Sequence, residues 1–170
     1  SENNPLEIIG CPGDHYSTYR WPGVGVEIGN KVYIYTYESA NGSTPANQAL
    51  LSITQNTSGL NWSGVTRLTP NGMTGNMDIS WSTGMIKKTA GDTVYVYGNK
   101  AVFFNANNVF LARYAASNPS VWTYWNGSSW TSTPSSASAA ALGIGGGNTS
   151  QANVMVSYVN GKYVMMQMDL

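Results

Sequence analysis

Apolar and polar residues alternate in three separate parts of the chain, and the three parts share one layout. An apolar stretch is followed by a short turn containing Gly, Asn or Asp, and then by a second stretch rich in Val, Tyr or Met. The three parts lie at residues 23–35, 84–97 and 154–166. Alternation with a period of two residues is typical of β-strands that bury one face. The sequence therefore predicts three β-hairpins, and it offers no amphipathic stretch long enough to predict an α-helix.

The hairpins belong to a longer repeat. Val94 follows Val32 by 62 positions, and Tyr163 follows Val94 by 69. The strands predicted in the three repeats are 23–28, 31–38, 48–54 and 64–69; then 79–86, 92–98, 108–115 and 120–125, with a last piece at Trp130; and finally 152–159 and 162–169. A period of this size with four strands in each unit is typical of β-propeller blades.

We therefore expect an all-β fold of about two and a half four-stranded antiparallel blades, forming a single β domain or a propeller fragment. Its expected parts are an irregular entry segment at 1–22, blades at 23–70 and 78–130, a Ser/Ala/Gly-rich loop at 131–151 and the start of a further blade at 152–170. A propeller closes with at least four blades. We thus expect an excerpt of a larger protein, or sheet edges completed by other chains or by self-association. A β-sandwich is the closed alternative.

The composition argues against some classes of binding partner and favours one cellular location. Only 9% of the residues are charged and the formal net charge is zero, which argues against partners that are nucleic acids or membrane surfaces. The single cysteine, Cys11, cannot form an internal disulfide. A Ser/Thr/Asn-rich surface with many aromatic residues favours a secreted, extracellular or cell-surface protein. Five Asn-x-Ser/Thr sequons are possible glycosylation sites, although abundant Asn, Ser and Thr also produce sequons by chance: Asn41, Asn56, Asn61, Asn126 and Asn148.

Several stretches resemble the bacterial secreted family catalogued as domain of unknown function 4185. They are Trp21–Val26 with Val32–Tyr35, Asp78–Gly84 with Val94–Gly98, and Phe110–Tyr114 with Trp122–Trp130. The resemblance covers residues 19–168 and lacks the first and last blades of that family. It implies a five-bladed propeller of the glycosidase type. Some members of the family are endo-D-arabinanases, so an arabinan-type or related polysaccharide is the implied substrate.

Glycoside hydrolysis usually needs two carboxyl groups, and the chain has eight acidic residues. Asp78 is the leading catalytic candidate, because it begins the innermost strand of its blade and resembles a family aspartate there. Asp14 is the second, just ahead of the first blade. Asp92 lies in a predicted turn, where Asp is favoured for local hydrogen bonds, and Glu38 ends a strand and points either way.

The candidate substrate-binding residues are mostly aromatic. Trp81 lies three positions after Asp78 and would form a sugar-stacking wall, or pack between blades. The others gather beside Asp14, in a stretch whose composition suits sugar recognition but also fits an ordinary surface loop: His15, Tyr19, Arg20 and Trp21. His15 is the only histidine, so we expect no metal site, and no motif indicates a cofactor.

Together these features predict a secreted carbohydrate-active protein of the glycoside hydrolase type that uses carboxylate acid/base chemistry. Two alternatives stay open. One is a carbohydrate-binding or adhesion module without catalysis, and the other is a structural subunit of an extracellular assembly.

Overall fold

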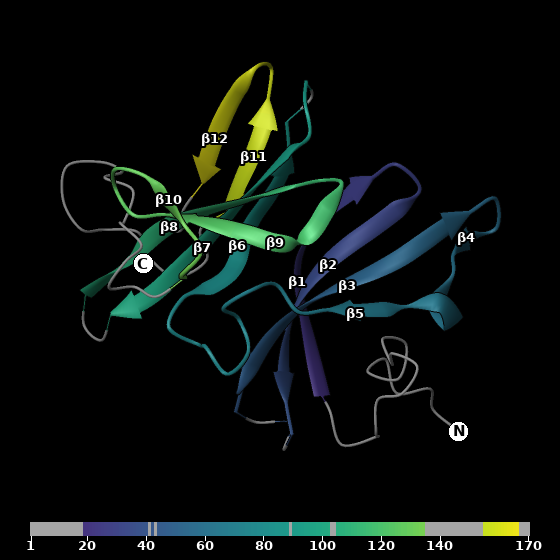
Figure 1. Cartoon of the computed structure of the whole chain (residues 1–170), viewed down its shortest axis with the longest axis horizontal. Coiled ribbons are helices and arrows are strands. Elements are labelled where there is room, and N and C mark those ends of the chain that lie inside the picture. The colour runs from purple at the N-terminus through teal and green to yellow at the C-terminus, as the bar shows by residue number, and fades with distance from the viewer. Residues whose placement is uncertain are drawn as a thin grey trace. The chain divides into compact units, whose positions relative to one another are not determined.

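The computed structural model describes residues 19–40, 42, 44–88, 90–102, 105–134 and 155–166, with the side chains of 101, 102 and 105–108 left aside. The chain divides into two compact units, Ser1–Met77 and Asp78–Leu170. Within the described residues all regular elements are β-strands apart from one three-residue 3₁₀ helix, so the predicted all-β class is confirmed. The antiparallel sheets in Figure 1 are consistent with part of a β-propeller or with a β-sandwich.

The first unit is one five-stranded antiparallel sheet. Its strands pair in the order β1-β2-β3-β4, and β5 also pairs with β3. The elements are β1 (Tyr19–Ile28), β2 (Lys31–Ser39), β3 (Asn47–Asn56), β4 (Gly59–Leu60), the 3₁₀ helix η2 (Trp62–Gly64) and β5 (Thr66–Leu68). The predicted pairing of the first two strands is confirmed by partners such as Glu27 and Val32.

The second unit holds a five-stranded sheet and a separate hairpin. The sheet order is β10-β9-β8-β7-β6, and the hairpin pairs β11 with β12. The elements are β6 (Ser80–Lys87), β7 (Thr93–Val102), β8 (Asn105–Ala115), β9 (Asn118–Trp125), β10 (Trp130–Thr131), β11 (Met155–Val159) and β12 (Lys162–Met166). Asn160 and Gly161 join the hairpin strands with φ of 49° and 78°. Asn-Gly suits this turn because both residues tolerate the left-handed region.

Two expectations about the strands need correction. The entry segment does not stay irregular up to residue 22, because β1 already begins at Tyr19. Pro22 lies inside that strand, next to a register shift between Pro22 and Gly25. Proline is tolerated there because β1 is an edge strand with an irregular ladder. In addition, each large sheet has five strands rather than four, since β4 and β10 are only two residues long and too short to show a period.

Aromatic rings fill the core of the second unit. Trp81 of β6, Trp122 and Tyr124 of β9 each have at most 1% of their surface exposed. The centroid of the Trp81 ring lies 5.3 Å from that of Tyr124 and 6.4 Å from that of Trp122. Tyr114 of β8 stacks on Trp122 at 5.2 Å. The alternation of β9 turns Trp125 to the other face, where it contacts Trp130 at 5.5 Å.

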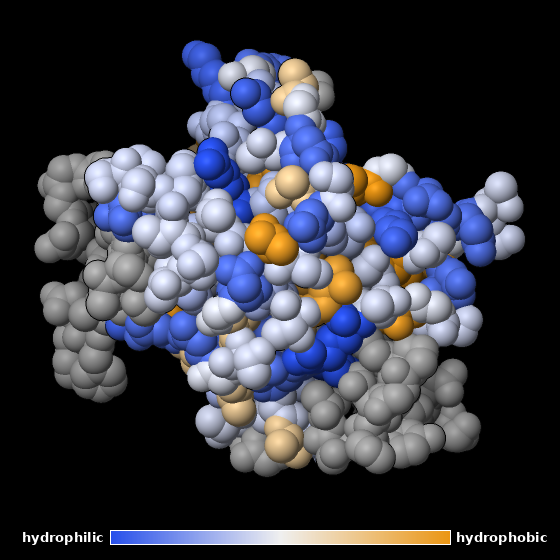
Figure 2. Space-filling view, viewed as in Figure 1, coloured by the Kyte–Doolittle hydropathy of each residue, from blue (hydrophilic) through white to orange (hydrophobic). Residues whose placement is uncertain are grey.

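The surface reflects the low charge of the chain. In Figure 2 the visible face is a mixture of hydrophilic and near-neutral residues, with only scattered hydrophobic ones. Six of the nine large apolar residues that stay exposed lie on the β11–β12 hairpin. This short hairpin is therefore the part of the described chain with the most uncovered apolar surface.

Replacing Trp81 with alanine should destabilise the protein by about 3–5 kcal/mol, because the substitution empties the centre of a packed aromatic core. Trp62, which is 40% exposed, is the matched control, and Trp62→Ala should change the free energy of unfolding by no more than about 0.5 kcal/mol. Urea unfolding followed by circular dichroism measures both. Equal effects of the two substitutions would contradict this account of the core.

Candidate functional site

The first strand of each unit begins beside an ion pair. In the first unit Arg20, on β1, faces Glu38, on β2. In the second unit Asp78, two residues before β6, contacts Lys100 on β7. Glu38 and Lys100 are 62 positions apart, which is also the spacing of Val32 and Val94. The repeat therefore places a charged pair at the same end of two hairpins, β1–β2 and β6–β7, which we call the inner hairpins. The signs of the charges are exchanged between the two.

Glu38 is the centre of a buried polar cluster. Arg67 of β5 donates from Nε to Glu38 Oε1 at 2.7 Å and from Nη2 to Oε2 at 2.6 Å. Arg20 Nε donates to Oε1 at 3.1 Å, and Asn47 Nδ2 donates to Oε2 at 3.0 Å. Each carboxylate oxygen thus accepts two hydrogen bonds. The bidentate contact with Arg67 fixes the orientation of the Glu38 carboxylate and also balances its charge.

These contacts keep Glu38 ionised. Burial by itself would raise the pKa of the carboxyl group, but the hydrogen bonds and positive charges of Arg67 and Arg20 outweigh it and hold the pKa below its usual value of 4.5. A carboxyl group in this state cannot donate a proton at neutral pH. Glu38 therefore positions Arg20 and Arg67 and is unsuited to the role of a general acid.

Of the predicted sugar-binding stretch, the structure describes Tyr19, Arg20 and Trp21. Tyr19 is 41% exposed and Trp21 is half-buried, so both rings present surface to a ligand. Arg20 is only 5% exposed and is engaged with Glu38, which suits it to holding the strand in place. Asp14 and His15 lie outside the described residues. The convergence of this stretch with Asp78 on one surface stays a prediction.

Asp78 is accessible. Its side chain is 39% exposed, and Lys100 Nζ donates to its Oδ1 at 2.9 Å. The other described acidic residue of this unit, Asp92, precedes the opposite end of β7. Lys100 follows it by eight positions, which is about 25 Å at the usual rise per residue. The two carboxyl groups are too far apart for glycoside hydrolysis, which needs about 5–10 Å.

Trp81 does not form the expected sugar-stacking wall. It is 1% exposed, and its ring packs on Trp122 and Tyr124 inside the second unit. A ligand cannot reach an aromatic face that the core already covers. Asp78 and Trp81 are three positions apart, so strand alternation places them on opposite sides, and Trp81 faces the core. The sequence alone did not show which side of β6 is buried.

Three residues of these ion pairs were not among the sequence candidates, namely Glu38, Arg67 and Lys100. The 62-residue repeat contained a usable signal for two of them, because it aligns Glu38 with Lys100 at the ends of equivalent strands. Arg67 carried no such signal. Its role depends on the pairing of β5 with β3, which brings it to a carboxylate 29 positions away in sequence.

The described sequons lie in turns and short connections. Asn56 is exposed at the end of β3, while Asn61 and Asn126 are half-buried, and Asn126 Oδ1 accepts hydrogen bonds from the backbone of Ser128 and Ser129. Asn41 and Asn148 lie outside the described residues. Within the described ranges, no three His, Cys, Asp or Glu side chains gather into a metal-binding group. The described residues also form no helix long and apolar enough to cross a membrane.

A family model described as domain of unknown function DUF5005 matches residues 8–170. The chain belongs to this family. The resemblance to domain of unknown function 4185 is not confirmed by this match. Comparison with curated proteins gives no match.

A solved structure from Bacteroides ovatus ATCC 8483, called a "putative hydrolase", is similar to this DUF5005 chain with a TM-score of 0.59 at 14% sequence identity. The similarity covers 91% of this chain and 39% of the other protein. The DUF5005 chain thus shares its fold with part of a longer protein.

Glu38→Gln should lower the free energy of unfolding by about 3–5 kcal/mol, because it leaves the buried charge of Arg20 without its partner. It should also change the response to acid. The folded-state pKa of Glu38 lies below 4.5. The stabilisation that ionised Glu38 gives the wild type is therefore complete above about pH 5 and is lost as the pH falls through this pKa. Urea unfolding between pH 7 and pH 3 should show a shallower loss of stability in Glu38→Gln. Glu27→Gln, at an exposed position of β1, is the control, and an equally shallow profile there would contradict the assignment to Glu38.

Proposed function

We propose that this DUF5005 chain is part of a secreted carbohydrate-active protein of the glycoside hydrolase type. The observation that carries the proposal is the accessible carboxylate of Asp78, held by Lys100 at the start of β6. The proposed substrate is an arabinan-type or related polysaccharide. This follows from the resemblance to the propeller family 4185, and the hydrolase name of the Bacteroides ovatus neighbour supports the same reaction class.

In this proposal Asp78 acts as the nucleophile or as the general base. The contact with Lys100 fixes the position of Oδ1, and the 39% exposure of the side chain leaves it open to a substrate. Its counterpart must come from outside the described residues of the second unit, because Asp92 is too distant. Asp14 is the proposed counterpart, as general acid, and its separation from Asp78 would decide between retention and inversion.

The aromatic residues at the start of β1 are the proposed sugar contacts. Tyr19 and Trp21 have exposed ring surface, and Thr36 Oγ1 donates to the carbonyl oxygen of Trp21 at 3.2 Å, which steadies the strand below the ring. Arg20, fixed by Glu38, contributes to binding by keeping both neighbours in place. His15 belongs to the same proposed binding stretch.

A non-catalytic carbohydrate-binding module is the second candidate. The observation that favours it is that the two described carboxyl groups of the first unit lie far apart and one of them is bound by arginines. Glu38 is fully engaged by two arginines, and Glu27 lies about 20 Å away along the strand at the usual rise per residue. The described part of the first unit can therefore present aromatic residues without offering a close pair of carboxylates.

Asp78→Asn should reduce the hydrolysis of the substrate by about 10²- to 10⁴-fold, since the amide can neither attack nor accept a proton. The assay follows the release of reducing ends from a panel of furanose- and pyranose-based polysaccharides, with circular dichroism to verify the fold. Asp92→Asn is the control with the same chemical change at a distant turn. Unchanged turnover in Asp78→Asn would contradict the catalytic role. Binding to a polysaccharide without turnover in the wild type would favour the binding module.

A further inference from the structure

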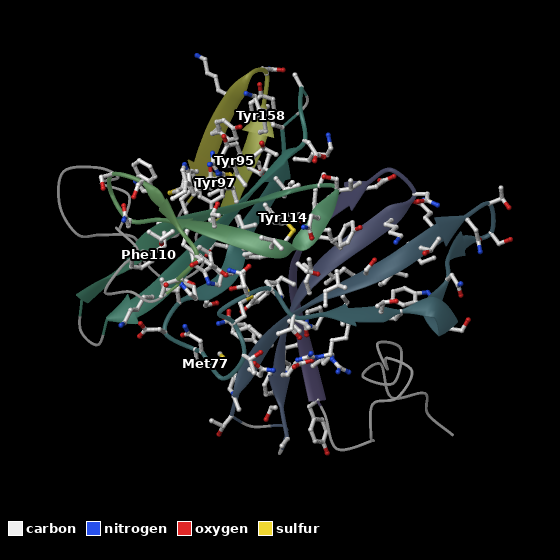
Figure 3. The ribbon with its side chains drawn as sticks, viewed as in Figure 1. Met77, Tyr95, Tyr97, Phe110, Tyr114 and Tyr158 are labelled. Atoms are coloured by element: carbon white, nitrogen blue, oxygen red, sulfur yellow. The ribbon has the colours of Figure 1, made fainter. Side chains whose placement is uncertain are left out.

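The β11–β12 hairpin has one covered face. Val156 and its cross-strand partner Met165 pack against a cluster of Ile86, Tyr97 and Val109. Tyr163 meets Tyr95 edge to face, with ring centroids 6.2 Å apart. Figure 3 shows Tyr95 and Tyr97 of β7 beside the hairpin that carries Tyr158. Contact between β11 and β6 is so close that a Cβ atom at Gly84 would lie 3.0 Å from Val156 Cβ.

The opposite face of the same hairpin is apolar and open. Residues that alternate with Val156 and Met165 point away from the sheet, and the four apolar ones have 41–57% of their surface exposed: Met155, Val159, Val164 and Met166. Lys162, the cross-strand partner of Val159, is the one charge on this face. It lies next to the Asn160–Gly161 turn.

The first strand of the second unit, β6, is covered on both faces. Five of the eight residues of β6 are buried, including the neighbours Thr83, Gly84, Met85 and Ile86. In the repeat, β11 corresponds to β6, because both are the first strand of their hairpin. Among the described residues, none covers β11 and β12 on the second face as β6 is covered, and an exposed apolar strand face of this kind promotes association.

The β1–β2 hairpin of the first unit carries a face that fits this position. Gly25 and Glu27 are exposed on β1, and their cross-strand partners Ile34 and Val32 are half-buried. The half of this face near the turn at residues 29 and 30 is apolar apart from Glu27, whereas Thr36 and Glu38 alternate onto its other half. Glu27 lies one residue pair further from its turn than Lys162 does, so both hairpins carry a charge near the turn, with opposite signs.

We propose that a second copy of this chain docks here, with its β1–β2 face on the open β11–β12 face. Val32 and Ile34 of one copy contact Val164 and Met166 of the next, and Glu27 pairs with Lys162. The zero net charge of the chain leaves no overall repulsion between copies. Because the two faces differ, the contact is head-to-tail, and it produces closed rings or open filaments according to the rotation at each step.

Sedimentation velocity of the full chain over a range of concentrations tests this contact. The wild type should self-associate. Val164→Lys, which places a second charge in the apolar face, should weaken association by at least about tenfold. The control is Val121→Lys on β9, where the valine is 55% exposed, and it should leave association unchanged.

A charge exchange tests the partner face. Glu27→Lys and Lys162→Glu should each weaken association by at least about fivefold, and the double substitution should restore it. Lys88→Glu, at another exposed lysine, controls for the change in net charge. Circular dichroism verifies the fold of each variant. A wild type that stays monomeric, a Val164→Lys variant that associates normally, or a double exchange without rescue would each overturn the proposal.

Discussion

A β-hairpin in this chain is stable only when sheet or side chains cover its faces, and most of the structure follows from this constraint. Two isolated strands are marginal in water, so each inner hairpin depends on its neighbours. β6 and β7 satisfy the requirement with an aromatic core on one side and the β11–β12 hairpin on the other. In the first unit, Val65, which follows η2, packs with Leu51 and Ile53 of β3, and Leu60 packs against this cluster. Among the described hairpins, β11–β12 carries the most exposed apolar residues, and β1 also keeps one exposed face.

The repeat also explains how one fold supports two different charged centres. The ends of β2 and β7 are equivalent positions, and both carry a charged side chain that reaches the beginning of the neighbouring inner strand. In the first unit the acidic group is buried and shared by two arginines, so its contribution is structural. In the second unit the acidic group lies ahead of the strand and is accessible. Burial, more than residue type, separates the supporting carboxylate from the candidate catalytic one.

Much of the fold could be predicted from alternation, because strand periodicity and turn residues are local. The hairpins at Gly29-Asn30 and Asn160-Gly161 are examples. The side of a strand that faces the core could not be predicted, since it depends on what packs against the sheet. Trp81 was misassigned for this reason, and Glu38 was left undecided. Contacts between distant strands were equally out of reach, as the pairing of Arg67 with Glu38 across 29 positions shows.

The same constraint also bears on the candidate site. A hydrolytic pair needs two carboxyl groups within about 10 Å, whereas the described carboxyl groups within each unit are about 20 Å or more apart along the strands. Strands separate the acidic residues of one sheet, so a close pair has to be built from different sheets. The surface proposed for association and the lack of a close carboxylate pair among the described residues therefore have one origin. The proposed association and the proposed hydrolysis have the same requirement, because each needs a second sheet beside the hairpin that carries the open face or the charged end.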